Sequence, residues 1–142
     1  MQYADINHQE FPIITIRFQN PEPTSQEFRV FLKDLSDLYL CGEKFIVIFD
    51  ASKVKAMSFE LRIRQAEFMK KYRTKIVKSV IMHVYVLPNA FQRAILKSIF
   101  LFQTPITPYH IVKTMEEAMQ VAKKEIGLND LPKYKLPPTE DF

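Results

Sequence analysis

The chain has 142 residues, of which 47% are hydrophobic and 25% charged, and these values are typical of one globular domain. Its single cysteine, Cys41, excludes an intramolecular disulfide framework and a metal site built from a cysteine cluster. The net charge of +4 permits contact with nucleic acid or a membrane surface without favouring either. We expect no transmembrane helix because no run of about 18 apolar residues is present, and the absence of a recognisable secretion signal predicts a cytoplasmic protein.

The first part of the chain predicts a β-hairpin, a helix and a buried strand. In chain order these are strands at Gln2–Ile6 and Pro12–Phe18, a helix from Thr24 or Ser25 to Gly42, and a strand at Phe45–Phe49. The alternation of apolar and polar residues indicates the first two strands, and Glu27 is placed for a capping box at the helix start. The uninterrupted apolar run Phe45–Phe49 indicates a central strand that is covered on both faces.

The second part predicts alternating helices and strands. In chain order these are a helix from Ser58 to about Ile76, a strand at Val80–Leu87, a helix from Asn89 to about Phe102, a strand at Tyr109–Val112 and a helix from Thr114 to Gly127. The order ββαβαβαβα predicts an α/β fold with parallel strands joined by right-handed crossovers. Residues 1–127 are therefore expected to form one domain, followed by a loosely held Pro-rich tail at 128–142.

The usual signatures of catalysis and cofactor binding are missing. Gly42 and Gly127 are the only glycines, so the chain has no Gly-rich phosphate loop and no dinucleotide-binding fingerprint. The histidines His8, His83 and His110 have no second ligand at metal spacing, and no nucleophile lies beside a base. The sequence predicts no metal, no cofactor and no catalytic residue, and we interpret His83 as a core histidine.

Asp50 follows the apolar strand directly, at the position where parallel α/β sheets place functional groups. A structural interpretation is also available, in which Asp50 is a turn aspartate that accepts hydrogen bonds from Ser52 and nearby backbone amides. The structural interpretation is favoured because no nucleophile–base pair accompanies the aspartate.

The second predicted helix is rich in cations. They are Arg62, Arg64, Lys70, Lys71, Arg73 and Lys75, with Lys78 just beyond. A solvated helix face with cations toward its C-terminus explains them without a partner. A docking surface for an acidic partner or nucleic acid is the less favoured alternative, because the cations spread around the helix instead of forming one stripe.

The third predicted helix carries more apolar residues than one buried face requires. Its inner stripe is predicted to be Phe91, Ala94, Ile95, Ile99 and Phe102. Leu96, Phe100 and Leu101 then remain. Either the Pro-rich loop and the C-terminal tail cover them, or they form an exposed apolar patch that marks a dimer interface or a groove for a hydrophobic ligand.

The segment Phe45–Leu61, FIVIFDASKVKAMSFEL, resembles the central signature of STAS domains, the fold of bacterial anti-sigma-factor antagonists. In that family an apolar strand is followed by Asp-Leu-Ser, a spacer with an apolar residue, a Met and then Asp-Ser-Ser-Gly-Leu, which opens a helix. The matching residues here are Asp50, Ala51, Ser52, Val54 and Met57.

Two later segments, Val84–Leu96 and Tyr109–Val121, are similar to strand–helix units of the same family, so the element order matches from about Tyr3 to Gly127. The resemblance implies a four- or five-stranded mixed sheet with an N-terminal β-hairpin and helices largely on one side. It also implies a regulatory role through binding to another protein.

The phosphorylated serine of that family has no counterpart at the matching position, where Glu60 stands instead. Ser58, two residues earlier, is explained as a helix cap. The serine–kinase switch is therefore not carried over to this chain. An acidic residue at a helix N-terminus is favourable in itself, and Glu60 could hold the surface permanently in a phosphorylated-like charge state.

The first functional hypothesis is a non-enzymatic regulatory or scaffolding module that binds another protein through the turn and helix start between Asp50 and Arg64. The predicted partner-binding residues are Asp50, Ser52, Ser58, Glu60, Arg62 and Arg64. The alternative is a carrier or sensor of a lipid or other apolar small molecule, with the third helix and the loop Gln103–Pro108 acting as a lid. A homodimer is compatible with the apolar patch, whereas an enzyme or a nucleic-acid binder is less well supported.

Overall fold

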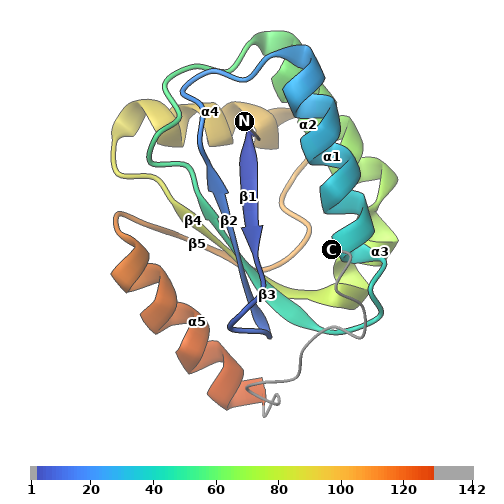
Figure 1. Ribbon diagram of the computed structural model, residues 1–142, viewed down its shortest axis with the longest axis vertical. Coiled ribbons are helices and arrows are strands. Elements are labelled where there is room, and N and C mark those ends of the chain that lie inside the picture. The colour runs from blue at the N-terminus through green and yellow to red at the C-terminus, as the bar shows by residue number, and fades with distance from the viewer. Residues whose placement is uncertain (1–2, 130–142) are drawn as a thin grey trace.

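The computed structural model describes residues 3–129, which form a five-stranded sheet whose strands lie side by side in chain order (Figure 1). The strands are β1 (Ala4–Asn7), β2 (Ile13–Phe18), β3 (Phe45–Asp50), β4 (Val80–Val86) and β5 (Tyr109–Val112). β1 runs antiparallel to β2, and each later strand runs parallel to the strand before it. The predicted mixed sheet with an N-terminal hairpin is therefore confirmed.

Helices cover both faces of this sheet unequally (Figure 1). They are α1 (Ser25–Tyr39), α2 (Phe59–Lys71), α3 (Arg73–Ser79), α4 (Ala90–Phe102) and α5 (Met115–Asn129). Phe45, Val47 and Phe49 of β3 pack in one cluster with buried residues of α1 to α4. Ile46 and Ile48 point to the opposite face and pack with Ala118, Ala122 and Ile126 of α5. The alternation of side chains along a strand thus divides the core into two, with most helices on one side as expected.

The starts of the helices follow the predicted capping residues. Thr24 Oγ1 accepts a hydrogen bond from the Glu27 amide at 3.1 Å, and Glu27 Oε1 accepts one from the Thr24 amide at 2.9 Å, which completes the capping box of α1. Ser58 Oγ accepts from the Leu61 amide at the start of α2. Thr114 Oγ1 accepts from the Glu117 amide at the start of α5. Short polar side chains therefore fix where these helices begin.

The prediction of one helix from Ser58 to about Ile76 is wrong, because the helix breaks at Tyr72 into α2 and α3. Helical spacing predicts an inner stripe of Phe59, Ile63, Ala66, Met69, Tyr72 and Ile76. Ala66 and Ile76 are buried as predicted, but Phe59 is 62% exposed. Leu61 and Phe68, outside that stripe, are buried instead. Apolar residues lie on several sides of this segment, so periodicity alone does not decide which side faces the sheet.

The last helix extends further than predicted. Gly127 lies within α5, which continues to Asn129. Residues 130–142 of the predicted Pro-rich tail lie outside the described residues.

Candidate functional site

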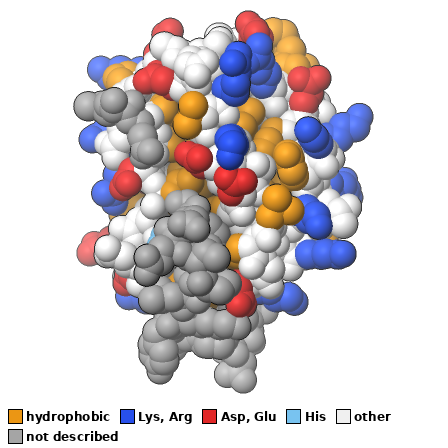
Figure 2. Space-filling model, turned by 45° about the vertical axis from the view of Figure 1, so that its right-hand side comes forward, with side chains coloured by type: hydrophobic (Ala, Val, Ile, Leu, Met, Phe, Trp, Pro, Cys, Tyr) orange, Lys and Arg blue, Asp and Glu red, His pale blue; other side chains and the backbone are white. Residues whose placement is uncertain are grey.

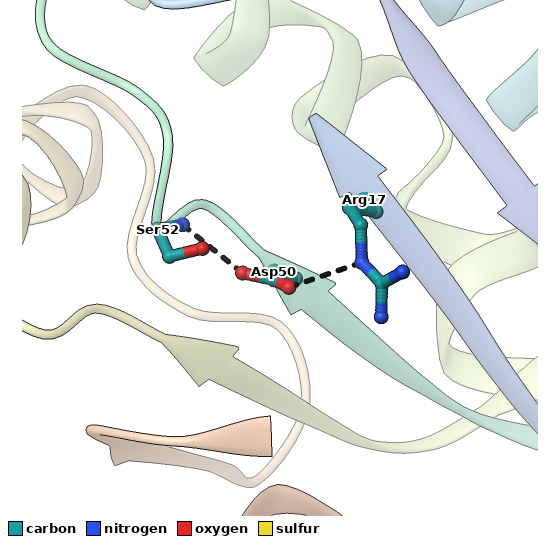
Figure 3. Close-up of polar contacts among 3 residues, drawn as sticks. All are labelled: Arg17, Asp50 and Ser52. Atoms are coloured by element: carbon teal, nitrogen blue, oxygen red, sulfur yellow. Dashed lines mark hydrogen bonds and ion pairs between the residues drawn. The ribbon is translucent and has the colours of Figure 1, made fainter. Parts of the chain in front are cut away.

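The carboxylate of Asp50 is held at the end of β3 by two neighbours (Figure 3). Asp50 Oδ2 lies 3.2 Å from Arg17 Nε, and Asp50 Oδ1 accepts a hydrogen bond from the Ser52 amide at 3.1 Å. The residue itself is buried. The bond from the Ser52 amide agrees with the structural interpretation of Asp50 as a turn aspartate. The contact with Arg17 was not predicted. The Arg17 contact arises from the register of β2 and β3, in which Arg17 is paired with Asp50.

Two other predicted partner-binding residues serve α2 and its neighbours. Ser58 caps α2. Arg62 donates a hydrogen bond from Nε to the Met57 carbonyl at 2.8 Å, and its Nη1 lies 3.5 Å from Ser98 Oγ of α4. Arg62 therefore ties α2 to the preceding loop and to α4.

Glu60 and Arg64 interact with each other on the surface of α2. The Arg64 Nη2 atom lies 2.8 Å from Glu60 Oε1, an ion pair one helical turn apart with both side chains substantially solvated. Ion pairs of this kind contribute little to stability. Of the six predicted partner-binding residues, Ser52, Ser58 and Glu60 are exposed, Arg62 and Arg64 are half-buried, and Asp50 is buried. Their role in binding a partner stays a prediction.

The cations of the second predicted helix are mostly exposed along α2 and α3. Lys70, Lys71, Arg73, Lys75 and Lys78 are all exposed. The space-filling view shows Lys and Arg side chains along the right-hand edge of one face, with hydrophobic side chains in a broken band beside them (Figure 2).

The third predicted helix, α4, is rotated relative to the expected orientation. Leu96, a member of the predicted apolar patch, is buried, and Phe91 and Phe102 of the predicted inner stripe are exposed. Phe100 is half-buried, and Leu101 is 84% exposed.

The rotation of α4 has a polar cause. Gln92 Nε2 donates to the carbonyl oxygens of Ser52 and Val54, both at 2.9 Å, and Gln92 Oε1 accepts from the Asn89 amide. A buried amide requires such partners, so Gln92 fixes the inward side of α4. The predicted stripe contained only hydrophobic residues and therefore missed this anchor.

An apolar cavity of about 100 Å³ lies between the sheet and helices α1, α2 and α4. Its lining includes Phe28 and Phe31 of α1, Phe49 of β3, Gln65 and Met69 of α2, Tyr85 of β4, and Ile95, Leu96 and Ile99 of α4. Among the described residues that line it there is no Lys, Arg, Asp or Glu. The cavity therefore suits an apolar guest.

A smaller cavity of about 30 Å³ adjoins the first on the side of the loop after α4. Pro105, Ile106 and Thr107 of that loop line it, together with His83 and Tyr39. The loop predicted as a lid therefore lines the smaller cavity. A hollow of about 250 Å³ lies on the other side of the sheet. Asp5, Glu10 and Arg17 are among the residues that line it, whereas no Lys, Arg, Asp or Glu is among the described residues that line the first two cavities.

His83 is a buried core residue, as predicted. Its Nδ1 atom lies 2.6 Å from Thr107 Oγ1 and its Nε2 atom 3.5 Å from the Tyr39 hydroxyl, while Thr107 Oγ1 donates to the Pro108 carbonyl. A proton on Nδ1 satisfies all these contacts, with Nε2 accepting from Tyr39. Burial lowers the pKa of His83 to about 4, so the ring is uncharged at neutral pH. It has a structural role and carries no free hydrogen-bonding site on either nitrogen.

No protein-family model and no curated protein match the chain. The resemblance to STAS domains therefore stays a prediction, and the function has to be argued from geometry. Within residues 3–129, no helix is both long and apolar enough to cross a membrane. The same residues contain no group of three His, Cys, Asp or Glu side chains that could hold a metal ion.

Proposed function

We propose that this protein binds an apolar small molecule between its sheet and helices α2 and α4, as a carrier or sensor. The observation that carries the proposal is the cavity of about 100 Å³ whose lining is almost entirely aromatic and aliphatic. Ligand sites in proteins are commonly concave and mainly apolar, with a few polar groups that orient the ligand.

The apolar character of the cavity supports the same proposal. Apolar side chains that line a hollow lack part of the contacts that they would make in a filled core. A guest of matching shape would restore the missing van der Waals contacts and would stabilise the folded state.

A fluorescent apolar probe tests the proposal directly. We expect N-phenyl-1-naphthylamine, an uncharged dye whose emission rises in apolar surroundings, to bind the purified protein saturably. Val54→Phe adds a ring to the cavity lining and should abolish the increase in emission. Val77→Phe makes the same change at an exposed position of α3 and should leave it unchanged.

The probe experiment contradicts the proposal under two outcomes. Wild-type protein that gives no saturable increase has no accessible apolar site. An equal loss in both variants, with far-UV circular dichroism showing that they are folded, would place the dye elsewhere.

The protein-binding hypothesis remains as a second candidate, and one surface favours it. The rings of Phe59 and Phe102 are in edge-to-face contact, with centroids 5.5 Å apart, and both are exposed, as is Leu101. We call these three residues the α2–α4 patch. Glu60, which follows Phe59 in α2, is also exposed. Exposed apolar patches commonly mark interfaces.

Affinity capture separates the second candidate from the first. A partner retained by the wild type but lost with Glu60→Ala and with Leu101→Ser would support a protein-binding module. Capture that neither substitution weakens would argue against this surface. Sedimentation of the free protein would show separately whether the patch forms a homodimer.

A further inference from the structure

The two cavities meet at four residues, which line both of them: Phe49, Gln65, Met69 and Tyr85. Phe49 and Met69 are apolar, and Met69 has a flexible unbranched side chain that can yield to a guest. Gln65 and Tyr85 approach the junction from different elements, α2 and β4. Gln65 and Tyr85 are therefore the two residues with polar side-chain groups that the cavities share.

The amides of Gln65 and Gln92 differ in how they are used. Gln92 is committed to Ser52, Val54 and Asn89. Within residues 3–129, neither the Gln65 amide nor the Tyr85 hydroxyl forms a hydrogen bond with another residue. Polar groups that line a site without protein partners are available to a ligand.

Packing holds the Tyr85 ring in place, so its hydroxyl has a defined position. The ring stacks on Phe49 with centroids 5.5 Å apart, and it makes an edge contact with Phe100 at 6.2 Å. Burial raises the pKa of Tyr85, and the hydroxyl therefore keeps its proton and can donate a hydrogen bond at neutral pH.

The absence of charge in both linings restricts the ligand. No Lys, Arg, Asp or Glu is present among the described residues that line either cavity. His83 is neutral and already hydrogen-bonded. A charged ligand group placed here would lose its hydration without gaining a counter-ion, which is strongly unfavourable.

We infer that the bound molecule is uncharged and carries one hydrogen-bonding group, such as a hydroxyl or carbonyl, that lies between the Gln65 amide and the Tyr85 hydroxyl. The inference rests on the proposed apolar-ligand function and adds a chemical class to it. The apolar body of the molecule occupies the larger cavity, and Gln65 and Tyr85 determine specificity. Gln65 offers both a donor and an acceptor, so the site accepts either polarity of hydrogen bond.

Three aromatic compounds of nearly equal size test this: naphthalene, 1-naphthol and 1-naphthoate, titrated at neutral pH and followed by NMR chemical shifts. We expect 1-naphthol to bind more tightly than naphthalene, and 1-naphthoate to bind most weakly. Gln65→Met and Tyr85→Phe should each weaken 1-naphthol binding by about fivefold, the effect of one typical hydrogen bond. Both should leave naphthalene affinity unchanged, because they retain the apolar volume and ring.

The outcomes distinguish this inference from the proposed function. If naphthalene and 1-naphthol both fail to bind, the proposed function itself fails. If naphthalene binds but 1-naphthoate binds as tightly as 1-naphthol, the uncharged class is wrong. If both variants keep the full preference for 1-naphthol over naphthalene, the assignment to Gln65 and Tyr85 is overturned. Equal binding of naphthalene and 1-naphthol by the wild type would overturn it as well.

Discussion

The two faces of the sheet are built from the same strands but are packed in different ways. On the α5 side, Ile46 and Ile48 of β3 meet Ala118 and Ala122, small residues that are completely buried. On the other side, β3 presents Phe45 and Phe49 to helices that also carry aromatic rings. Small side chains let a helix lie close to the sheet. The apolar cavity lies on the aromatic side, whereas the hollow on the α5 side has a polar lining. We therefore expect tighter apolar packing against α5 than around the cavity.

Truncation of one isoleucine on each face should show this difference most strongly. We expect Ile48→Ala to lower the free energy of unfolding by about 4 kcal/mol and Ile95→Ala by about 2 kcal/mol, the upper and lower parts of the usual range. Ile48 is completely buried among close neighbours, whereas Ile95 borders the cavity and already lacks contacts on one side. Urea denaturation measures both values, and equal losses would contradict the proposed difference in packing.

Acidification should destabilise the cavity side through His83. The pKa of His83 is lowered to about 4 in the folded protein, below the value near 6.5 of an unperturbed histidine. Between these pH values the unfolded chain binds more protons than the folded protein does. The contribution of neutral His83 to the free energy of unfolding is therefore fully present above about pH 6.5. It is lost as the pH decreases toward 4, by at most roughly 3 kcal/mol.

His83→Asn provides the control for the pH prediction, because carboxylates also titrate in the acidic range. The wild type should lose more stability than the variant between pH 7 and pH 4. The two curves would run parallel if His83 did not contribute.

Enlarging one alanine on each face should give a smaller difference in stability, again with the greater loss on the α5 side. Ala122→Leu on the α5 side should cost about 2 kcal/mol, because no space is available for a larger side chain. Ala51→Leu adds the same volume beside the cavity and should change stability little. Thermal melts of the two variants provide the measurement, and an equally destabilised Ala51→Leu protein would show that the cavity cannot accept added volume.

Much of the fold could be predicted because local signals agreed with the tertiary structure. The apolar run Phe45–Phe49 indicated a strand buried on both faces, and β3 is central and covered on both. Thr24, Ser58 and Thr114 marked helix starts correctly. Each of these signals depends on residues a few positions apart, which a sequence displays directly.

The candidate site was less accessible to prediction because it depends on contacts between distant segments. Arg17 meets Asp50 only through the register of parallel strands, and Gln92 sets the rotation of α4 by bonding to residues about forty positions earlier. A cavity is also a property of side-chain volumes from several elements. The excess of apolar residues on α4 was the one local signal of it, although Leu96 contributes by lining the cavity and not by forming a surface patch.

The strand order carries a consequence for synthesis on the ribosome. Because each strand pairs with the one made just before it, the sheet can grow by one edge as the chain emerges. All the residues that line the larger cavity lie between Tyr3 and Ile99, so that site can be assembled before α5 exists. Until α5 is made, Ile46, Ile48 and Val84 have no cover on their own face. A nascent chain stalled before Met115 would therefore contain all the residues of the larger cavity and an exposed hydrophobic sheet face. Exposed hydrophobic surface of this kind promotes aggregation, so this is the state in which the protein most needs a chaperone.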